Sequence, residues 1–149
     1  MRRGRLDFFD VDHTITRHAT AGRFMMRAIA RGLAPWTVAL ALPWYGAAYR
    51  LGLLRLKDRV DIAGSLRGVS RADLEAVARE TFEHSMRGDL NLSVERLIRE
   101  RLAAGRRVVL ATSTLDIVVA PLAAHLGVRD VIATRLEFEA GVATGRAEG

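Results

Sequence analysis

The chain has 149 residues, of which 50% are hydrophobic, and these numbers fit one compact domain and exclude a disordered chain. The net charge of +6 comes from arginines interspersed with acidic residues, and Lys57 is the only lysine. This pattern indicates a mixed-charge, solvated surface rather than a nucleic-acid interface.

Residue types that are missing exclude several kinds of site. The absence of cysteine excludes disulfides, thiolate zinc sites and cysteine nucleophiles, and it permits a reducing, cytoplasmic location. A basic cluster at residues 1–5 has no apolar stretch behind it, so we expect no secretion signal and a cytoplasmic protein. None of the four histidines is paired at the helical spacing of a metal site (His13, His18, His84 and His125).

The first predicted element is a short buried strand over residues 6–9, which leads directly into Asp10 and Asp12. Residues 17–90 then contain no alternating strand pattern, and a stripe at helical spacing predicts an amphipathic helix (Leu74, Val77, Ala78, Phe82 and Met86). We expect this stretch to be a helical insert.

One part of the insert, residues 33–49, carries no charge and contains two tryptophans. Pro35 and Pro43 interrupt it, and a membrane span needs about 20 apolar residues. We therefore expect a buried helical pair here. Membrane contact stays open as an alternative, because aromatic residues flanked by arginines suit an interfacial segment.

The second half of the chain alternates between helices and strands. A helix capped by Ser93 is predicted over residues 93–104, a strand over 108–111, a helix over 115–126 that Pro121 kinks or restarts, and a strand over 131–134. The stretch "RLEFEAGVATG" is typical of a hairpin. This order predicts an α/β fold with a Rossmann-like parallel sheet that includes the first strand.

The paired aspartates are the candidate reactive groups. In an extended strand Asp10 and Asp12 would face the same side, with Cα atoms about 6 to 7 Å apart. One carboxylate could attack a phosphate ester while the other protonates the departing oxygen, and a cation such as Mg²⁺ would offset the like charges. Thr112, with the amide of Ser113, could bind a phosphate oxygen at the neighbouring strand end.

Alternatives to this site exist. The aspartates could belong to an ordinary strand-to-loop turn in which Thr14 bonds the backbone, and Thr112 and Ser113 could cap a helix. A calcium loop is excluded because Ile15 and Ala21 stand where glycine and glutamate are needed.

Taken together, "FFDVDHTIT", "VVLATST" and the stretch that follows resemble the motifs of the haloacid dehalogenase superfamily, in particular its phosphoserine-phosphatase-like branch. The resemblance implies a Mg²⁺-dependent phosphatase for a small phosphorylated substrate, with Asp10 as nucleophile and Asp12 as acid and base. It also implies that Thr112, Ser113 and Thr14 bind substrate or phosphate, and that Asp10 and Asp12 hold the metal. By the same resemblance, residues 1–16 and 91–149 would form the core and residues 17–90 a helical cap.

Two features depart from the family pattern. The motif lysine and the acidic pair G-D-x-x-x-D that complete the family's site are not present after Thr112. Ala19 stands where phosphoserine phosphatases carry the acid that reads the substrate amine. We therefore expect an amino-terminal portion of a phosphatase with an incomplete core. A missing carboxyl-terminal segment or a second copy could cover the exposed sheet edge, and a catalytically incompetent binding or partner module is the alternative function.

Overall fold

The structure is a computed structural model that describes residues 6–52 and 61–149. Its strands are β1 (Leu6–Asp10), β2 (Arg107–Leu115), β3 (Asp130–Glu139) and β4 (Val142–Glu148). Its α-helices are α1 (Thr20–Ala30), α2 (Thr37–Arg50), α3 (Ile62–Ser65), α4 (Arg71–Thr81), α5 (Leu92–Ala103) and α6 (Asp116–Leu126). A π-helical turn, η2 (Phe82–Met86), and a 3-10 turn, η3 (Arg87–Asp89), continue from α4.

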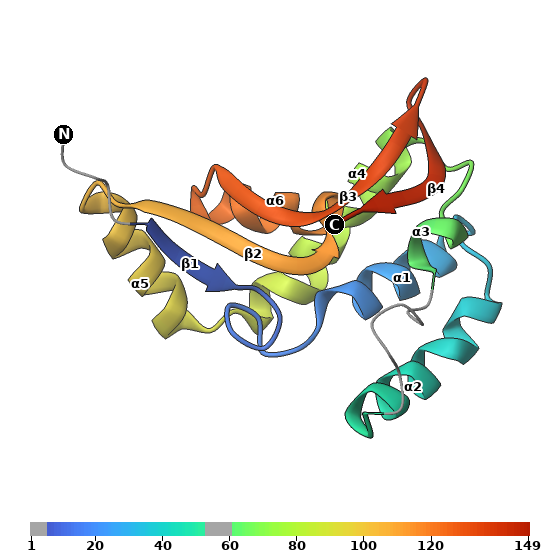
Figure 1. The fold of residues 1–149 in the computed structure, drawn as a ribbon, viewed down its shortest axis with the longest axis horizontal. Coiled ribbons are helices and arrows are strands. Elements are labelled where there is room, and N and C mark those ends of the chain that lie inside the picture. The colour runs from blue at the N-terminus through green and yellow to red at the C-terminus, as the bar shows by residue number, and fades with distance from the viewer. Residues whose placement is uncertain (1–5, 53–60) are drawn as a thin grey trace.

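The described strands form one sheet in the order β1-β2-β3-β4 (Figure 1). β1, β2 and β3 run parallel, and β4 returns antiparallel to β3. The predicted α/β fold with a parallel sheet is therefore confirmed. The strands are longer than predicted, and β2 continues through Thr112 to Leu115.

β1 differs from its prediction as a strand buried on both faces. It lies at the edge of the described sheet, and Leu6 and Phe8 are exposed while Phe9 packs against a buried cluster. An apolar run of four residues predicts a strand but does not say how many layers cover it. The prediction that both faces of the strand are buried was wrong for this reason, whereas the exposed apolar edge expected for an incomplete core is confirmed in the described sheet.

The predicted hairpin is confirmed as β3 and β4. Ala140 and Gly141 connect them, with φ angles of 49° and 76°. Two successive residues with positive φ match the right-handed twist of the paired strands, which is why such a short connection suffices.

The helices of the second half form as predicted except at their ends. α5 begins one residue earlier than expected because Asn91, not Ser93, caps it and accepts a hydrogen bond from the Ser93 amide at 3.2 Å. α6 is a single helix that runs through Pro121 without a restart. It ends at Gly127, whose φ of 74° is the left-handed conformation that glycine adopts most easily.

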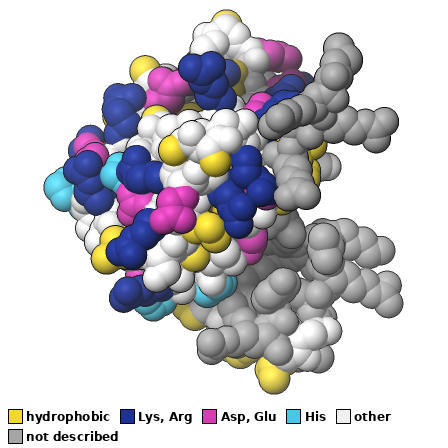
Figure 2. All heavy atoms as spheres, turned by 90° about the vertical axis from the view of Figure 1, so that its left-hand side faces the viewer, with side chains coloured by type: hydrophobic (Ala, Val, Ile, Leu, Met, Phe, Trp, Pro, Cys, Tyr) yellow, Lys and Arg dark blue, Asp and Glu magenta, His cyan; other side chains and the backbone are white. Residues whose placement is uncertain are grey.

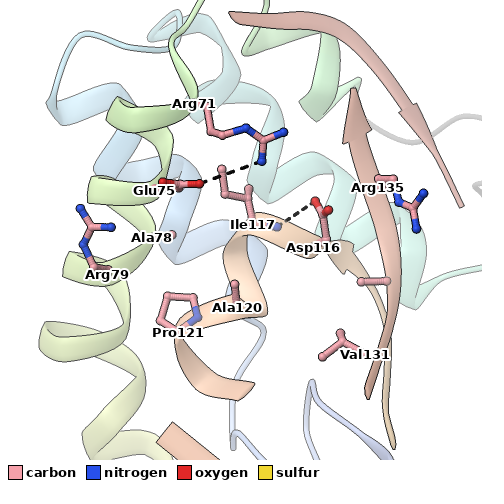
Figure 3. Close-up of a pocket in the computed structure, with 11 residues that line it drawn as sticks. Arg71, Glu75, Ala78, Arg79, Asp116, Ile117, Ala120, Pro121, Val131 and Arg135 are labelled. Atoms are coloured by element: carbon pink, nitrogen blue, oxygen red, sulfur yellow. Dashed lines mark hydrogen bonds and ion pairs between the residues drawn. The ribbon is translucent and has the colours of Figure 1, made fainter. Parts of the chain in front are cut away.

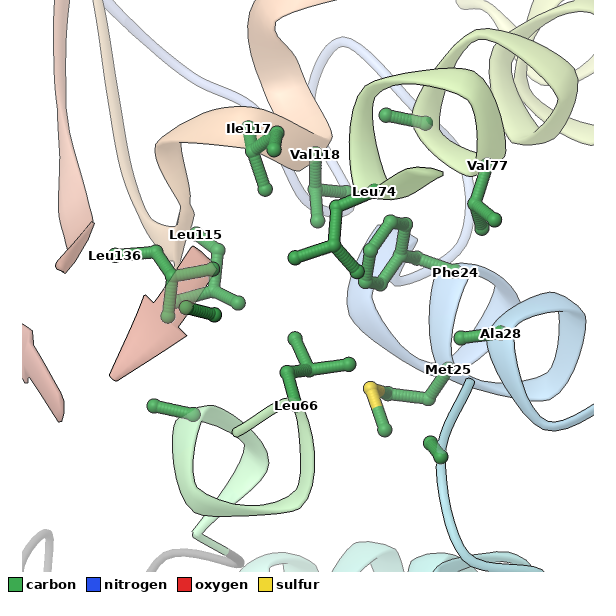
Figure 4. Close-up of a cluster of buried hydrophobic side chains, with 14 residues drawn as sticks. Phe24, Met25, Ala28, Leu66, Leu74, Val77, Leu115, Ile117, Val118 and Leu136 are labelled. Atoms are coloured by element: carbon green, nitrogen blue, oxygen red, sulfur yellow. The ribbon is translucent and has the colours of Figure 1, made fainter. Parts of the chain in front are cut away.

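Two hydrophobic clusters hold the helices on the sheet, and both contain residues of the insert. In the first, Phe24 and Met25 of α1 and Leu74 of α4 pack with Leu115 and Leu136 of the sheet (Figure 4). The second joins Phe82 and Met86 to Val108, Leu110 and α6. The predicted stripe from Leu74 to Met86 is buried, as expected. A division into core and cap remains a prediction.

The charge-free segment 33–49 does not form the expected buried helical pair. It contains one helix, α2, which includes Pro43 and contacts α1. Trp36, Leu40 and Trp44 are exposed. A charge-free sequence predicts burial only where another element is available to cover it, and here the described residues cover one face of the helix.

The surface that carries α5 and the amino-terminal ends of the strands has the mixed charge that the sequence predicts. Basic and acidic side chains alternate over this face (Figure 2). Several are paired, such as Arg107 with Asp130 at 2.7 Å and Arg99 with Glu95 at 2.8 Å. Exposed pairs of this kind contribute little to stability.

Candidate functional site

A tight turn follows β1 and determines where the second aspartate lies. The carbonyl oxygen of Val11 accepts hydrogen bonds from the amides of Ile15 and Thr16, both at 3.0 Å, and from the Thr16 hydroxyl at 3.2 Å. β1 therefore ends at Asp10, and Asp12 lies in the turn. The expected extended strand through Asp12 was wrong, because Val11 turns its carbonyl toward the loop instead of toward a neighbouring strand.

Three threonines hold the Asp12 carboxylate. Its Oδ1 atom accepts hydrogen bonds from the amide and the hydroxyl of Thr20, both at 2.8 Å. Its Oδ2 atom accepts from the Thr114 hydroxyl at 2.9 Å and from the Thr112 hydroxyl at 3.4 Å. We call Thr20, Thr112 and Thr114 the threonine clamp; it links the first residue of α1 to the end of β2 through one carboxylate.

Strand geometry explains which residues of "TST" reach Asp12. Side chains alternate along a strand, so Thr112 and Thr114 point to one side and Ser113 to the other. Ser113 is exposed, and its carbonyl oxygen accepts a hydrogen bond from Thr134 at 2.9 Å. Thr112 thus lies at the predicted place, whereas Thr114 and Thr20 are contacts that the sequence reasoning missed. Side chains alternate every two residues along a strand, so a prediction that extended β2 past Ala111 would have placed Thr114 on the same side as Thr112.

The helix-capping alternative for Thr112 and Ser113 was wrong. α6 begins at Asp116 after Leu115, and no side chain caps it. The Asp116 carboxylate instead accepts hydrogen bonds from the amides of Ile117 at 2.8 Å and Leu136 at 3.2 Å. This carboxylate fixes the start of α6 against β3.

Asp10 is placed beside the clamp but differs from Asp12 in its contacts. It pairs with Ala111 across the β1–β2 ladder, so it lies next to the strand position before Thr112. Its side chain is exposed, and no residue in the described ranges hydrogen-bonds it. The structure therefore presents one unengaged carboxylate and one fully hydrogen-bonded carboxylate at the carboxyl edge of a parallel sheet.

Thr14, the remaining candidate, has a different environment from the one predicted for it. Its amide approaches the Val11 carbonyl at 3.4 Å, and its hydroxyl makes no hydrogen bond within the described residues. The backbone-bonding role foreseen for Thr14 belongs to Thr16, whose hydroxyl also donates to the His18 carbonyl at 2.8 Å.

The two ends of the helical insert meet beside this turn. Asp89 accepts hydrogen bonds from the His18 amide at 3.0 Å and from Arg23 at 2.7 Å, and it contacts the His18 ring at 2.8 Å. Burial raises the pKa of Asp89, but the hydrogen bonds from His18 and Arg23 outweigh this effect, and the pKa lies below its usual value. Asp89 thus stabilises a turn that lies about 70 positions earlier in the chain.

A pocket of about 490 Å³ lies between α4, α6 and β3 (Figure 3). Arg71, Arg79 and Arg135 line it together with Glu75 and Asp116. None of the predicted site residues lines this pocket. It is a feature separate from the aspartate pair.

The residues at the aspartate pair fit a magnesium ion in part. Magnesium prefers oxygen ligands, often only one or two carboxylates together with water, and the free Asp10 carboxylate meets this preference. Across residues 6–52 and 61–149, no group of three acidic or histidine side chains is assembled that could hold a metal by itself. Asp10 is therefore the first ligand we would assign.

The sheet, its helices and the aspartates at the end of β1 define an α/β protein with acidic residues at the carboxyl edge of a parallel sheet, and comparison with known families specifies its class. The model of the haloacid dehalogenase-like hydrolases matches residues 8–149. The chain belongs to this family, and the resemblance of its motifs is confirmed.

The chain is similar in sequence to proteins from mycobacteria. It is 30% identical to phosphoserine phosphatase SerB1 of Mycobacterium tuberculosis over 152 residues, which cover 95% of this chain and 48% of the relative. A putative hydrolase of Mycobacterium leprae is 29% identical over 149 residues. The chain spans about half the length of the curated relatives it matches.

Solved structures agree on the fold. A protein of unknown function from Bordetella pertussis Tohama I superposes with a TM-score of 0.82 at 29% identity, covering 98% of this chain and 67% of its own. A phosphoserine phosphatase captured as an analogue of its phospho-aspartyl intermediate superposes with a TM-score of 0.64 at 19% identity, covering 99% and 64%. The chain therefore has the fold of the parts of these structures that it covers.

Proposed function

We propose that this chain carries the nucleophile and the general acid of a phosphomonoester hydrolase. The observation that supports the proposal best is the contrast between Asp10, exposed and unengaged, and Asp12, held by the threonine clamp at the same sheet edge. A nucleophile must be free to reach phosphorus, whereas an acid and base must be held in a fixed orientation. Each aspartate has the environment that its proposed role requires.

In the proposed reaction a carboxylate oxygen of Asp10 attacks phosphorus and the bond from phosphorus to the ester oxygen breaks. Asp12, in its protonated form, gives its proton to the departing oxygen. A water molecule then attacks the aspartyl phosphate while Asp12 accepts its proton. Inorganic phosphate leaves, and the Asp10 carboxylate is restored. The Thr112 hydroxyl, at the end of β2, would donate to a phosphate oxygen.

Magnesium completes this proposal. We assign Asp10 as the residue that would bind the ion through its carboxylate. Asp12 would be the second ligand, as the family resemblance implies. When bound, the ion would neutralise charge between the phosphate and the attacking carboxylate. Ser113 and Thr14 remain proposed phosphate contacts, Ser113 through its amide.

The helical insert, residues 17–90, would act as a cap over a small phosphorylated substrate and exclude water from the attack step. Ala19 precedes α1, where the resemblance places the acid that reads a substrate amine. Alanine has no charge for that purpose. We therefore propose a phosphomonoester other than phosphoserine as the substrate.

A binding or partner module is the second candidate. The motif lysine and the acidic pair of the family are not found after Thr112, and no three-carboxylate cluster forms among the described residues. Such a module would bind a phosphorylated ligand without turning it over.

One experiment separates the two functions. Phosphate release from p-nitrophenyl phosphate is measured with Mg²⁺ and with a chelator, for the native chain, Asp10→Asn and the control Asp130→Asn. Turnover that needs Mg²⁺, persists in Asp130→Asn and disappears in Asp10→Asn supports the hydrolase. Phosphate binding without any release supports the module, and full activity in Asp10→Asn would contradict the proposed nucleophile.

A further inference from the structure

Large apolar side chains on helix α2 and at its two ends are exposed to solvent. Trp36 is 68% exposed, Leu40 63%, Trp44 78% and Leu51 71%. Leu40 and Trp44 belong to α2, whereas Trp36 directly precedes the helix and Leu51 directly follows it. The spacings of four, four and seven residues are those of one helical face. We call these four residues the tryptophan stripe. Large apolar side chains grouped on a surface mark a place where something binds.

The opposite face of the helix explains why the stripe points outward. Val38 and Leu42 pack against the first hydrophobic cluster, beside α1. α2 lies at the far side of α1 from the sheet (Figure 1), and the helix contacts in the described chain are to α1. The stripe is thus held outward by a packed inner face.

The dimensions of α2 favour a surface position. Its 14 residues extend roughly 21 Å at 1.5 Å per residue, less than the hydrocarbon core of a bilayer, which is about 30 Å. Within the described ranges no helix has the length and apolar character that crossing a membrane requires. A short helix with exposed tryptophans on one face suits the boundary between headgroups and acyl chains, where indole rings are enriched.

Charge is segregated toward the same part of the chain. No acidic residue occurs between Asp12 and Asp58, whereas the remainder of the chain holds 16 basic and 17 acidic residues. The positive net charge of the protein therefore originates in this segment, which contains α1 and α2. Its basic residues are Arg17, Arg23, Arg27, Arg31, Arg50, Arg55 and Lys57.

Contacts within the fold offset only part of this charge. Arg23 pairs with Asp89, and Arg27 and Arg31 share the single carboxylate of Glu80. Arg17 is exposed. A net positive segment that carries an exposed apolar stripe is complementary to a surface that is both anionic and apolar.

We propose that the tryptophan stripe docks this protein onto a membrane surface that contains anionic lipids. The tryptophans and Leu40 enter the boundary region, α2 lies parallel to the membrane, and the net positive charge of the segment between Asp12 and Asp58 attracts the headgroups. A second copy of the chain is disfavoured as the occupant, because it would bring two positive segments together. The proposal is independent of the phosphatase activity.

The chain provides its own reporter for the test, because Trp36 and Trp44 are its only tryptophans. Tryptophan emission and co-sedimentation are measured with vesicles of phosphatidylcholine alone and with vesicles that also contain phosphatidylglycerol. Leu40→Glu and the uncharged Leu40→Gln place a polar group in the stripe and keep both tryptophans. Leu92→Glu on α5 is the matched control, since Leu92 is exposed outside the stripe.

We expect a blue shift and co-sedimentation with the anionic vesicles that weaken as salt is added. Leu40→Glu should reduce the partition at least tenfold, Leu40→Gln should reduce it less, and Leu92→Glu should leave it unchanged. Circular dichroism confirms that each variant is folded. The proposal is overturned if anionic vesicles bind no protein, if they bind no better than neutral ones, or if Leu40→Glu binds as well as Leu92→Glu. It is also overturned if light scattering shows a dimer whose tryptophans are already buried without lipid.

Discussion

The turn after β1 precedes α1 in the chain, and helix α2 follows it. The key side chains of the turn are bonded within the fold, whereas those of α2 are exposed. In the turn, the Asp12 carboxylate is hydrogen-bonded by the threonine clamp, and Asp89 holds the adjoining backbone. On α2 and at its ends, the tryptophan stripe is left exposed. The described residues therefore satisfy the carboxylates of Asp12 and Asp89, whereas they leave the tryptophan stripe uncovered.

The largest expected effect concerns Asp10, which lies beside the clamp but outside it. Asp10→Asn should reduce kcat/KM on the order of 10⁴-fold or more, since removing a covalent nucleophile removes the reaction path. The melting temperature should hardly change, because no described residue hydrogen-bonds Asp10. Steady-state kinetics and thermal unfolding measured on the same samples check both parts. A large fall in stability would instead indicate a structural role.

The next largest effect is a loss of stability when a buried residue of α1 is truncated, in contrast to the exposed residues of α2. Phe24 is fully buried in the first hydrophobic cluster. Phe24→Ala should lower the free energy of unfolding by about 3–5 kcal/mol, through lost burial and the cavity that remains. Urea unfolding measures this loss. A cost below that of an exposed substitution would mean that the cluster is not the core of the protein.

A smaller effect isolates the clamp. Thr114→Val removes the hydroxyl that donates to Asp12 and should cost about 1–3 kcal/mol, because a carboxylate oxygen of the half-buried Asp12 loses its closest partner on β2. Ser113→Ala, at the neighbouring exposed position, should stay within about 0.5 kcal/mol. Equal costs for the two variants would contradict the clamp as a stabilising contact. Chemical denaturation of the two variants side by side provides the measurement.

Asp89 adds an effect that depends on pH. Its pKa is lower in the folded protein than in the unfolded chain, so its contribution to stability is present above the ordinary aspartate pKa and is lost as the pH falls through the folded value. Asp89→Asn should therefore be less stable than the native chain near neutral pH, and this difference should shrink in acid. Unfolding curves recorded from neutral to acidic pH check the trend, and a constant difference would contradict it.

The smallest expected effect is on α2. Trp44→Ala should change the free energy of unfolding by no more than about 0.5 kcal/mol, since the side chain is exposed. Thermal unfolding without lipid measures it. A loss comparable to that of Phe24→Ala would mean that the stripe belongs to the core.

The sequence predicted the sheet well, and the site residues remain a prediction. Apolar runs and helical spacing indicated β1, the first half of β2, α5, α6 and the hairpin, because each of these patterns is local. Asp10, Asp12 and Thr112 were expected near one another because parallel strands end at one edge of a sheet, and the structure brings them together there.

The rest could not be predicted because it depends on contacts between distant residues. Thr20 and Thr114 reach Asp12 only after Val11 turns the chain out of β1, and Asp89 reaches His18 across the whole insert. The burial of residues 33–49 was misjudged for the same reason. Hydrophobicity indicates that a helix will be covered, but only the fold shows whether a partner element is present.

The edge position of β1 has a consequence for the strand that ends in Asp10. In a parallel ladder, successive backbone amides point alternately to the two sides of a strand, and within the described residues β2 pairs with one side only. Hydrogen exchange along β1 should therefore alternate between slow and fast amides. Any segment that joins this edge would be detected as new protection at every second residue, directly before the Asp10 carboxylate.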